Sequence, residues 1–487
     1  MIKLQISAKW NRDTKSLIIP IIASKNPFKS IMPLAHFSKT TLQETFKGEK
    51  GELQILPTEK QTIYLLGLGE EPFNSRNIIK IFRSLSHRHK GKLSHKIGLY
   101  LHHLKSPEKI VEFALTGLLL GTYKIGHFKS EKQELHPFET KGASLKIYTE
   151  AKTNSLRKAA QKGIATAETQ MSIFGLVNAP SNKKVPAVLA KWAVDSGKKY
   201  GYQVEVWDKP KIEKKGLHAL LAVNRGSEFP ARFIITEYKG KKAKHKVGLV
   251  GKGVTFDTGG ISIKGAMNMH MMKSDMGGAA AVLGTVEMAA KLQLPIHLIG
   301  IVPATDNSVD ALAIKPGDVI DSYSGKTIEV IDTDAEGRLI LSDGIAYMLR
   351  HFKPDTLIDL ATLTGSAVRT FGYHAGALFS NNDSLAEAIS KAGNTTGERV
   401  WRLPIWDVYH DEMKSDVADI KNFSGRPMAG AITAAKFLQF FTEEHPNWAH
   451  MDIAGVAFND ADFSSQKSAT AFGIRLLINY LENLSEK

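Results

Sequence analysis

The sequence predicts an α/β protein with two domains, a smaller N-terminal α/β domain and a larger C-terminal α/β domain whose mixed central sheet is flanked by helices. Three observations support this prediction. The chain has 487 residues, more than one hydrophobic core usually organises. Short β-branched or aromatic runs alternate with stretches of helical periodicity. Residues 62–85 contain a strand pattern, a glycine turn and a helical pattern, which is the order of a βα unit.

The first third of the chain has the alternating pattern of a small α/β domain. The N-terminus begins with a strand pattern, and short runs bounded by turn formers indicate buried strands at 17–22, 62–68 and 96–102. A helical pattern covers 77–85. We therefore assign residues 1–150 to the N-terminal domain.

A long helical pattern over 154–174 is expected to connect the two domains, and we assign this connection to residues 151–175. Asn-Ala-Pro-Ser-Asn at 178–182 then interrupts the helix, and helical periodicity resumes over 186–200. The C-terminal domain is assigned to residues 176–487. In it, strands are expected at 247–250, 297–303, 327–332, 356–360 and 450–453, and helices at 277–292, 337–352, 384–392 and 432–442.

The composition is that of an ordinary globular protein, with 43% hydrophobic and 23% charged residues. No apolar run approaches the roughly 20 residues of a membrane-spanning helix, and the N-terminus does not resemble a signal peptide. The absence of cysteine excludes disulfides, thiolate metal ligands and a cysteine nucleophile. We therefore expect a cytoplasmic protein that does not contact a membrane.

The net charge of +15 is unevenly distributed, because residues 1–150 hold 24 Lys and Arg against 13 Asp and Glu. A basic domain of this kind is compatible with a nucleic acid or an acidic partner. No helix-turn-helix pattern or aromatic-interleaved basic stretch accompanies the charge, so a solvated surface is the favoured interpretation.

Two glycine-rich segments, 250–264 and 332–339, place charged residues after predicted strands, where open α/β sheets form their sites. The carboxylates in or near these segments are those of Asp257, Asp275, Asp334 and Glu336. Clustered carboxylates repel one another unless cations neutralise them, and hard oxygen donors suit two ions of Mg²⁺, Mn²⁺ or Zn²⁺. Asp334 and Glu336 are two residues apart, so an extended backbone would direct both side chains to one side.

The same segments contain the basic residues Lys252, Lys264 and Arg338. Lys264 and Arg338 are expected to stabilise an oxyanion or to hold a small anion. Ordinary ion pairs within loops are the alternative interpretation, and seven charged residues gathered in two glycine-marked loops disfavour it.

Thr-Asp-Ala-Glu-Gly-Arg-Leu at 333–339 resembles the signature of the leucyl aminopeptidase family, also called cytosol aminopeptidases. The glycines, Lys252, Asp257 and Lys264 of the first segment are similar to the other core motif of that family. Further similar stretches follow the family order at 178–182, 359–365, 401–404, 425–427, 429–434 and 448–455. The first third of the chain resembles the family only in its βα character.

The resemblance implies a dinuclear-metal aminopeptidase that releases N-terminal residues, preferably leucine and similar ones, from peptides. The implied cofactors are two divalent ions per subunit, Mn²⁺ or Zn²⁺, with Mg²⁺ as a further option. As ligands, Asp257 and Glu336 would bridge the two ions, Lys252 and Asp275 would complete one site, and Asp334 would complete the other. Lys252 has to be a neutral amine to act as a ligand.

The remaining implied roles concern substrate and assembly. Lys264 would stabilise the oxyanion of the tetrahedral intermediate, and Arg338 would hold a bicarbonate that serves as general base. The pocket for the first residue would be formed by Met272, Thr362, Leu363 and Gly365. The resemblance further implies a homohexamer with the catalytic domains inside.

Three residues stand out against the family pattern. Asp332 occupies a position where asparagine is usual, and we expect it to form a hydrogen bond beside the metal ligands. Gly265 stands where proline is common, which would loosen that loop. His270 matches no ligand position, so we expect a surface or packing role.

Two alternative functions remain open. A DNA-binding accessory protein would use the basic N-terminal domain, with or without peptidase activity. A two-metal phosphoesterase would also need clustered carboxylates, although such sites typically include histidine ligands and these motifs contain none.

Overall fold

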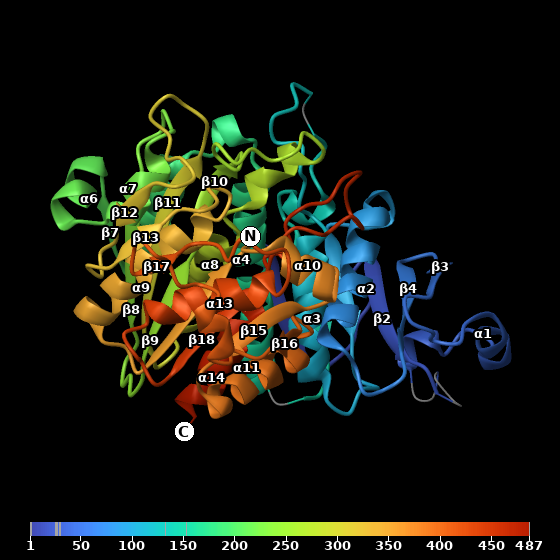
Figure 1. The fold of residues 1–487 in the computed structure, drawn as a ribbon. Coiled ribbons are helices and arrows are strands. Elements are labelled where there is room, and N and C mark those ends of the chain that lie inside the picture. Colours follow the sequence, from blue (N-terminus) through green and yellow to red (C-terminus); the bar gives the residue numbers. More distant parts are fainter. Residues whose placement is uncertain (1, 25–27, 29–30, 132, 152, 487) are drawn as a thin grey trace. The chain divides into compact units, whose positions relative to one another are not determined.

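The computed structural model describes residues 2–24, 28, 31–131, 133–151 and 153–486. The chain divides into two compact units, Met1–Met171 and Ser172–Lys487. The division falls inside helix α4 (Thr153–Asn178), so the long helix predicted over 154–174 is present (Figure 1). Each unit has its own sheet and its own hydrophobic core.

The first unit is a small α/β domain, as predicted. Its strands and helices are β1 (Lys3–Ser7), β2 (Ser16–Ile22), α1 (Lys39–Thr45), β3 (Leu53–Pro57), β4 (Thr62–Gly69), α2 (Ser75–Arg88), β5 (Lys96–Tyr100), α3 (Pro107–Leu120) and β6 (Ser144–Tyr148). The sheet order is β1-β6-β5-β2-β4-β3, and its strands are parallel except for β3, which pairs antiparallel with β4. Helix α2 begins after Asn74, whose side chain accepts hydrogen bonds from the main-chain N–H groups of Arg76 and Asn77.

The second unit alternates strands and helices as predicted, with further elements that the sequence prediction omits. Its helices are α5 (Pro186–Tyr200), α6 (Lys209–Lys215), α7 (His218–Asn224), α8 (Gly277–Leu292), α9 (Glu336–Phe352), α10 (Gly365–Phe371), α11 (Asp383–Thr396), α12 (Val408–Asp411), α13 (Gly430–Phe440) and α14 (Ile474–Ser485). Its strands are β7 (Gln203–Trp207), β8 (Arg232–Lys239), β9 (Lys246–Gly251), β10 (Gly253–Asp257), β11 (His297–Asn307), β12 (Val319–Asp321), β13 (Thr327–Glu329), β14 (Thr356–Ala361), β15 (Gly376–Ser380), β16 (Val400–Arg402), β17 (Ile420–Lys421) and β18 (Trp448–Asp452).

The central sheet of this unit is mixed, with strand order β16-β15-β18-β14-β9-β11-β8-β7 and with β10 paired to β11. Strands β18, β14, β9, β11 and β10 pair in parallel, whereas the β15–β18, β11–β8 and β8–β7 pairs are antiparallel. A separate sheet of three short strands has the order β12-β13-β17. Among the described helices, none combines the length and the apolarity needed to cross a bilayer.

Helices α8 and α9 cover opposite faces of the central sheet. A Cβ atom added at Gly248 would lie 2.8 Å from the sulfur of Met348 on α9. At Gly251, three residues further along β9, it would lie 2.6 Å from the main-chain oxygen of Gly278 on α8. Side chains alternate between the faces of a strand, so these two glycines let the helices approach from the two sides. Both helices therefore begin at the same edge of the sheet, where β10 and β14 end.

The strand predicted at 327–332 is shorter than expected, because β13 ends at Glu329. The main-chain N–H groups of Ile331 and Asp332 donate instead to the side-chain oxygen of Asn422, at 2.8 and 3.2 Å. This side chain replaces the neighbouring strand as hydrogen-bond partner, which ends the ladder and begins the loop that leads into α9.

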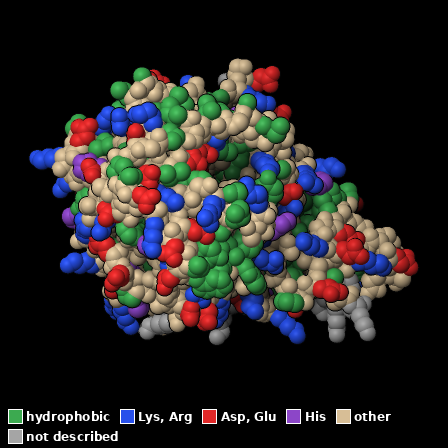
Figure 2. All heavy atoms as spheres, in the orientation of Figure 1, with side chains coloured by type: hydrophobic (Ala, Val, Ile, Leu, Met, Phe, Trp, Pro, Cys, Tyr) green, Lys and Arg blue, Asp and Glu red, His purple; other side chains and the backbone are tan. Residues whose placement is uncertain are grey.

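Large apolar side chains are exposed on the second unit around β16. Trp401, Trp406 and Val408 are 68%, 65% and 63% exposed. Figure 2 shows hydrophobic side chains gathered where Figure 1 labels β15 and β16. Contiguous apolar surface of this kind is typical of an interaction site.

Candidate metal centre

The predicted site residues meet at the edge of the central sheet where β10 and β14 end. Lys252 lies between β9 and β10, and Asp257 is the last residue of β10. Asp275 lies two residues before α8, and Glu336 is the first residue of α9. The N-terminal end of a helix carries partial positive charge, which favours the carboxylates that lie beside the first turns of α8 and α9.

Two expectations about the second segment are wrong. It follows β13 of the three-stranded sheet rather than a strand of the central sheet. The backbone between Asp334 and Glu336 is not extended, because a turn at 333–334 leads directly into α9. The turn and the first residue of α9 bring both side chains into one cluster. The prediction that they point to the same side is therefore met, but not by an extended backbone.

The carboxylates of Asp257, Asp334 and Glu336 form the core of the cluster. One oxygen from each lies within 4.8 Å of the others, which is close enough for one cation to bind all three. Asp275 joins this group through Lys252, whose Nζ lies 2.8 Å from Oδ2 of Asp275 and 2.8 Å from Oε1 of Glu336. Lys252 Nζ also donates a hydrogen bond to the main-chain oxygen of Thr362 at 3.1 Å.

Gly337 is required where Lys252 crosses the start of α9. A Cβ atom at this position would lie 2.6 Å from Cε of Lys252, so any other residue would displace the lysine side chain. The glycine in the second motif therefore serves the lysine in the first motif, which joins the two segments in space.

Lys264 is the second cation of the cluster. Its Nζ lies 2.8 Å from Oδ2 of Asp257 and also pairs with Oδ1 of Asp334. Its side chain is 23% exposed, against 4% for Lys252, so Lys264 lies at the open side of the cluster and Lys252 at its floor. This difference in depth suits a ligand role for Lys252 and a substrate-facing role for Lys264.

The pKa values show how burial shifts the ionisation of the acids and the lysine in the cluster. Burial, followed by the charges of Asp257 and Glu336, raises the pKa of Asp334 to about 7. Burial is also the first cause of the raised pKa values of Asp275 and Glu336. Burial opposes the charge on Lys252, but Asp275, Glu336 and Asp257 together raise the pKa of its amine above the usual value. The acids therefore need positive charge beside them to stay ionised.

The cluster fits divalent cations. Among the described side chains, Oδ2 of Asp275, Oδ1 of Asp334 and both carboxylate oxygens of Glu336 are buried. Three of these oxygens face the ammonium groups of Lys252 and Lys264 in ion pairs, and Oε2 of Glu336 has no partner among the described residues. Buried carboxylate oxygens that converge on one place, with positive charge beside them, are the donor set that hard cations bind.

Asn307 and Thr333 hold the two segments together, and neither is among the predicted site residues. Asn307, at the end of β11, donates from Nδ2 to Oδ1 of Asp257 at 2.9 Å and to the main-chain oxygen of Thr333 at 3.0 Å. The Thr333 hydroxyl donates to the main-chain oxygen of Gly259 at 2.7 Å and accepts from the N–H of Ser262 at 2.8 Å. The predicted strand at 297–303 ends before Asn307, whereas β11 extends to it, so the sequence prediction does not place this amide at the end of a central strand.

Arg338 lies in the first turn of α9 and is 5% exposed. It donates from one guanidinium nitrogen to the main-chain oxygen of Asn422 at 2.7 Å, while its buried Nε has no hydrogen-bond partner among the described residues. Burial lowers the pKa of Arg338 to about 10, so it remains charged at neutral pH. A buried guanidinium with a free N–H suits a small planar anion.

Asp332 and His270 take the places expected for them, whereas the loosening of the loop expected from Gly265 stays a prediction. Asp332 accepts a hydrogen bond at 2.8 Å from the main-chain N–H of Asp334, so its side chain fixes the turn that carries a predicted ligand. His270 is exposed on the short helix η5 (Met269–Ser274), and Gly265 is exposed with no atom within 4 Å of an added Cβ.

The predicted pocket residues flank the cluster. Thr362 donates from Oγ1 to Oδ1 of Asp275 at 2.7 Å, and the main-chain N–H of Leu363 donates to Asp452 at 3.1 Å. Gly365 begins α10, and Met272 lies in η5 and is half-buried. Met272 thus lies just before Asp275, and the other three residues lie between the end of β14 and the first residue of α10.

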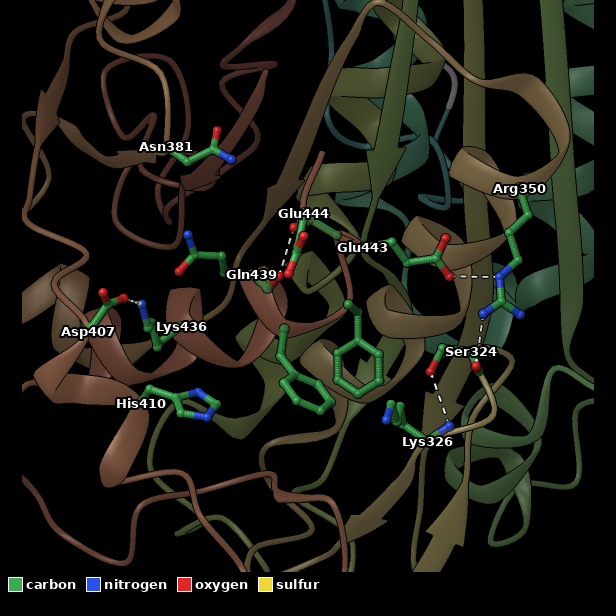
Figure 3. A pocket seen from close by; sticks show the side chains of 13 residues that line it. Ser324, Lys326, Arg350, Asn381, Asp407, His410, Lys436, Gln439, Glu443 and Glu444 are labelled. Carbon is green, nitrogen blue, oxygen red and sulfur yellow. Dashed lines mark hydrogen bonds and ion pairs between the residues drawn. The ribbon is translucent and has the colours of Figure 1, made fainter. Parts of the chain in front are cut away.

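A separate cavity of about 620 Å³ lies elsewhere in the second unit (Figure 3) and contains none of the predicted site residues. Phe440 and Phe441 line it, and its charged side chains include two ion pairs. Arg350 Nε lies 2.7 Å from Glu443, and Lys436 Nζ lies 2.8 Å from Asp407. Since these charges are neutralised within the cavity wall, the carboxylate cluster is the better candidate for chemistry.

Comparisons with known proteins agree with the two-unit organisation. Residues 174–478 match the model of the cytosol aminopeptidase family, catalytic domain, and residues 36–132 match the model of the N-terminal domain of the same family. A probable cytosol aminopeptidase of Chlorobaculum tepidum is 48% identical over 389 residues, 78% of this chain and 77% of the relative. One of Chloroherpeton thalassium is 41% identical over 493 residues, 96% of each chain. Among solved structures, the bottromycin maturation enzyme BotP in complex with Mn has a TM-score of 0.85 at 30% identity, covering 97% of this chain and 100% of BotP.

Proposed function

The chain belongs to the cytosol aminopeptidase family and is therefore a metal-dependent aminopeptidase, and we propose that it releases leucine and similar residues from the N-termini of peptides. The observation that supports this most strongly is the carboxylate cluster of Asp257, Asp334 and Glu336 with Lys264 at its open side. The cluster offers ligands for cations, and Lys264 offers a positive charge where substrate enters.

The proposed ligands divide the cluster into two positions. Asp257 and Glu336 would be shared between them, Lys252 and Asp275 would belong to one, and Asp334 would belong to the other. Two divalent cations bound there would supply an acidified water and polarise the scissile carbonyl. Lys252 would bind as a neutral amine, so cation binding and loss of its proton are coupled.

Lys264 and Arg338 are the proposed catalytic residues. The Lys264 ammonium would stabilise the negative charge that develops on the carbonyl oxygen in the transition state. Arg338 would hold a bicarbonate through its guanidinium, and its buried, unpartnered Nε supports this role. Bicarbonate would supply the general base, because the segments 250–264 and 332–339 contain no histidine.

The proposed substrate preference depends on the loops around the cluster. The position formed by Lys252 and Asp275 is where we expect the substrate's free amino group, which would restrict cleavage to the first residue. Met272, Thr362, Leu363 and Gly365 would line the pocket for that residue. A half-buried methionine and an exposed glycine leave room for an aliphatic side chain such as that of leucine.

The proposed metals are Mn²⁺ or Zn²⁺, with Mg²⁺ as a further option, because oxygen ligands with one amine suit all three. The similarity to BotP in complex with Mn supports manganese.

We propose a homohexamer located in the cytoplasm. The exposed Trp401, Trp406 and Val408 support self-association, because apolar surface of this kind is usually covered by a partner. The names of the curated relatives support the location. Nothing in the comparisons supports the DNA-binding alternative, and a nucleic-acid partner is not part of the proposal.

The test compares leucyl-glycine with N-acetyl-leucyl-glycine and p-nitrophenyl phosphate as substrates of the Mn²⁺-loaded protein. We expect release of leucine from the free dipeptide alone. Cleavage of the acetylated peptide would contradict an aminopeptidase, and hydrolysis of the phosphate ester without peptidase activity would favour a phosphoesterase.

A further inference from the structure

Lys184 is a buried lysine that the proposed mechanism does not use. It follows the short helix η4 (Ser181–Lys183), and its residue is 0% exposed. Within the described part of the chain, no carboxylate forms an ion pair with its amine. A buried amine without a carboxylate partner is costly, so its presence calls for a specific contact.

The contacts of Lys184 are main-chain oxygens from two segments far apart in sequence. Its Nζ donates to the oxygen of Val177, at the end of α4, at 3.4 Å, and to the oxygen of Lys273. Lys273 lies in η5, between the proposed pocket residue Met272 and the proposed ligand Asp275. The side chain thus connects the corner after α4 to the loop that carries both site residues.

The loop that Lys184 reaches is only partly buried. None of the side chains of η5 is fully buried, and Met267 just before it is 88% exposed. The loop also passes through Asn268 in a left-handed conformation, with φ of 65°. In a segment whose side chains are only partly buried, hydrogen bonds to the rest of the fold contribute to its position.

The contact does not require a particular charge on the amine. Burial, with Lys273 as the second cause, lowers the pKa of Lys184 to about 7. An ammonium group and a neutral amine both donate hydrogen bonds to carbonyl oxygens, so the tie to Lys273 persists in both states.

We propose that Lys184 is a positioning residue that holds residues 272–275 in place, so that Asp275 reaches its cation and Met272 reaches the first residue of the substrate. This inference rests on the proposed metal site. Replacing a residue that orients a metal ligand without binding the metal itself typically lowers metal affinity or activity about 10- to 100-fold.

The test titrates Mn²⁺ into metal-free protein by calorimetry and measures amide hydrogen exchange over 266–276. It compares wild type with Lys184→Met, which keeps the length but removes the donor, and with Lys183→Met, the same change at the exposed neighbouring lysine. We expect Lys184→Met to bind Mn²⁺ at one of two sites about 10-fold more weakly or worse, to exchange faster over 266–276 and to raise KM as well as lower kcat. Lys183→Met should match wild type.

The outcomes separate this inference from the proposed function. If Lys184→Met binds Mn²⁺ as tightly as Lys183→Met and its amides exchange at the same rate over 266–276, the positioning role is overturned. Wild type that binds no Mn²⁺ overturns the metal site itself. If Lys184→Met does not fold, Lys184→Gln replaces it, because the shorter amide does not reach Lys273; a folded Lys184→Gln with wild-type affinity also overturns the role.

Discussion

Asn307 donates a hydrogen bond from Nδ2 to Oδ1 of Asp257 across 2.9 Å, and this bond turns a proposed bridging ligand toward the cluster. The same nitrogen also reaches the main chain of Thr333, one residue before Asp334. One amide therefore sets the separation of two ligands that lie far apart in the sequence.

Asn307→Leu should weaken binding of divalent cations about 10- to 100-fold, because Asp257 loses the donor that orients it. Calorimetric titration of the metal-free protein with Mn²⁺ measures this. Asn224→Leu is the matched control, since Asn224 is a buried amide that donates to Phe229 and Thr305 rather than to a proposed ligand. Equal metal affinities in the two variants would contradict the role of Asn307.

Glu336→Gln should lower kcat/KM by on the order of 1000-fold or more, because the residue is proposed to ligate both cations and is fully buried. Hydrolysis of leucine p-nitroanilide at saturating Mn²⁺ measures the loss. Glu287→Gln removes another buried carboxylate, paired with Lys291 on α8, and should cost stability rather than activity. Near wild-type turnover by a folded, metal-loaded Glu336→Gln would rule out the bridging role.

The two lysines of the cluster should give different losses when each is changed to Met. Lys264→Met should lower kcat about 100- to 1000-fold while two metals remain bound, because it removes only the oxyanion contact. Lys252→Met should lose metal, because it removes a ligand. Kinetics paired with metal analysis distinguish the two, and a loss of metal from Lys264→Met instead would mean that the roles are exchanged.

Arg338→Met should remove the response of the enzyme to bicarbonate. In buffer depleted of carbon dioxide, added bicarbonate should raise kcat of the wild type and leave the variant unchanged. A wild type that is indifferent to bicarbonate would contradict the proposed base, although it would leave the metal site intact.

Asp343 should make the second unit less stable as the pH rises. Burial raises the pKa of Asp343 to about 7, while its carboxylate accepts main-chain hydrogen bonds from Leu220 and Tyr323. The folded state keeps this proton up to about pH 7, whereas the unfolded chain loses it near 4, so unfolding releases a proton between these values. The free energy of unfolding contributed by this group therefore falls as the pH rises through the window, by up to about 4 kcal/mol.

The difference in Tm between wild type and Asp343→Asn measures this contribution, because titration of all other groups cancels. The advantage of the wild type should shrink between pH 5 and pH 8. Asp195→Asn, at an exposed carboxylate paired with Lys191, should follow the wild type at every pH. A wild-type advantage that grows with pH would give the opposite sign and contradict the raised pKa.

The local sequence predicts those parts of the fold whose boundaries depend on nearby residues. Helix α5 has Pro186 in its first turn, and it ends before Gly201, which has a left-handed backbone conformation. The helix predicted over 186–200 is confirmed. The strand at 327–332 was overextended because Asn422, some 90 residues later, takes the hydrogen bonds of its last residues. No local pattern indicates a partner so distant.

The site shows the same division between local and tertiary information. The carboxylates and lysines could be predicted because their chemistry is unusual among glycines, and the structure brings the predicted metal ligands together. Asn307, Asn422 and Lys184 could not, because an amide or a lysine in an ordinary local pattern becomes informative only through what it contacts. Each of them donates a hydrogen bond from its side chain to a main-chain oxygen of another segment of the fold.

The most direct measurement of the central claim is hydrolysis of leucine p-nitroanilide by the purified protein after EDTA treatment, then after addition of Mn²⁺ or Zn²⁺, with bound metal counted. We predict that activity disappears with chelation and returns as two ions bind per chain. Activity that survives complete removal of metal, or a folded protein that binds two ions and remains inactive with every metal, would contradict a metal-dependent aminopeptidase built on Asp257, Asp334 and Glu336.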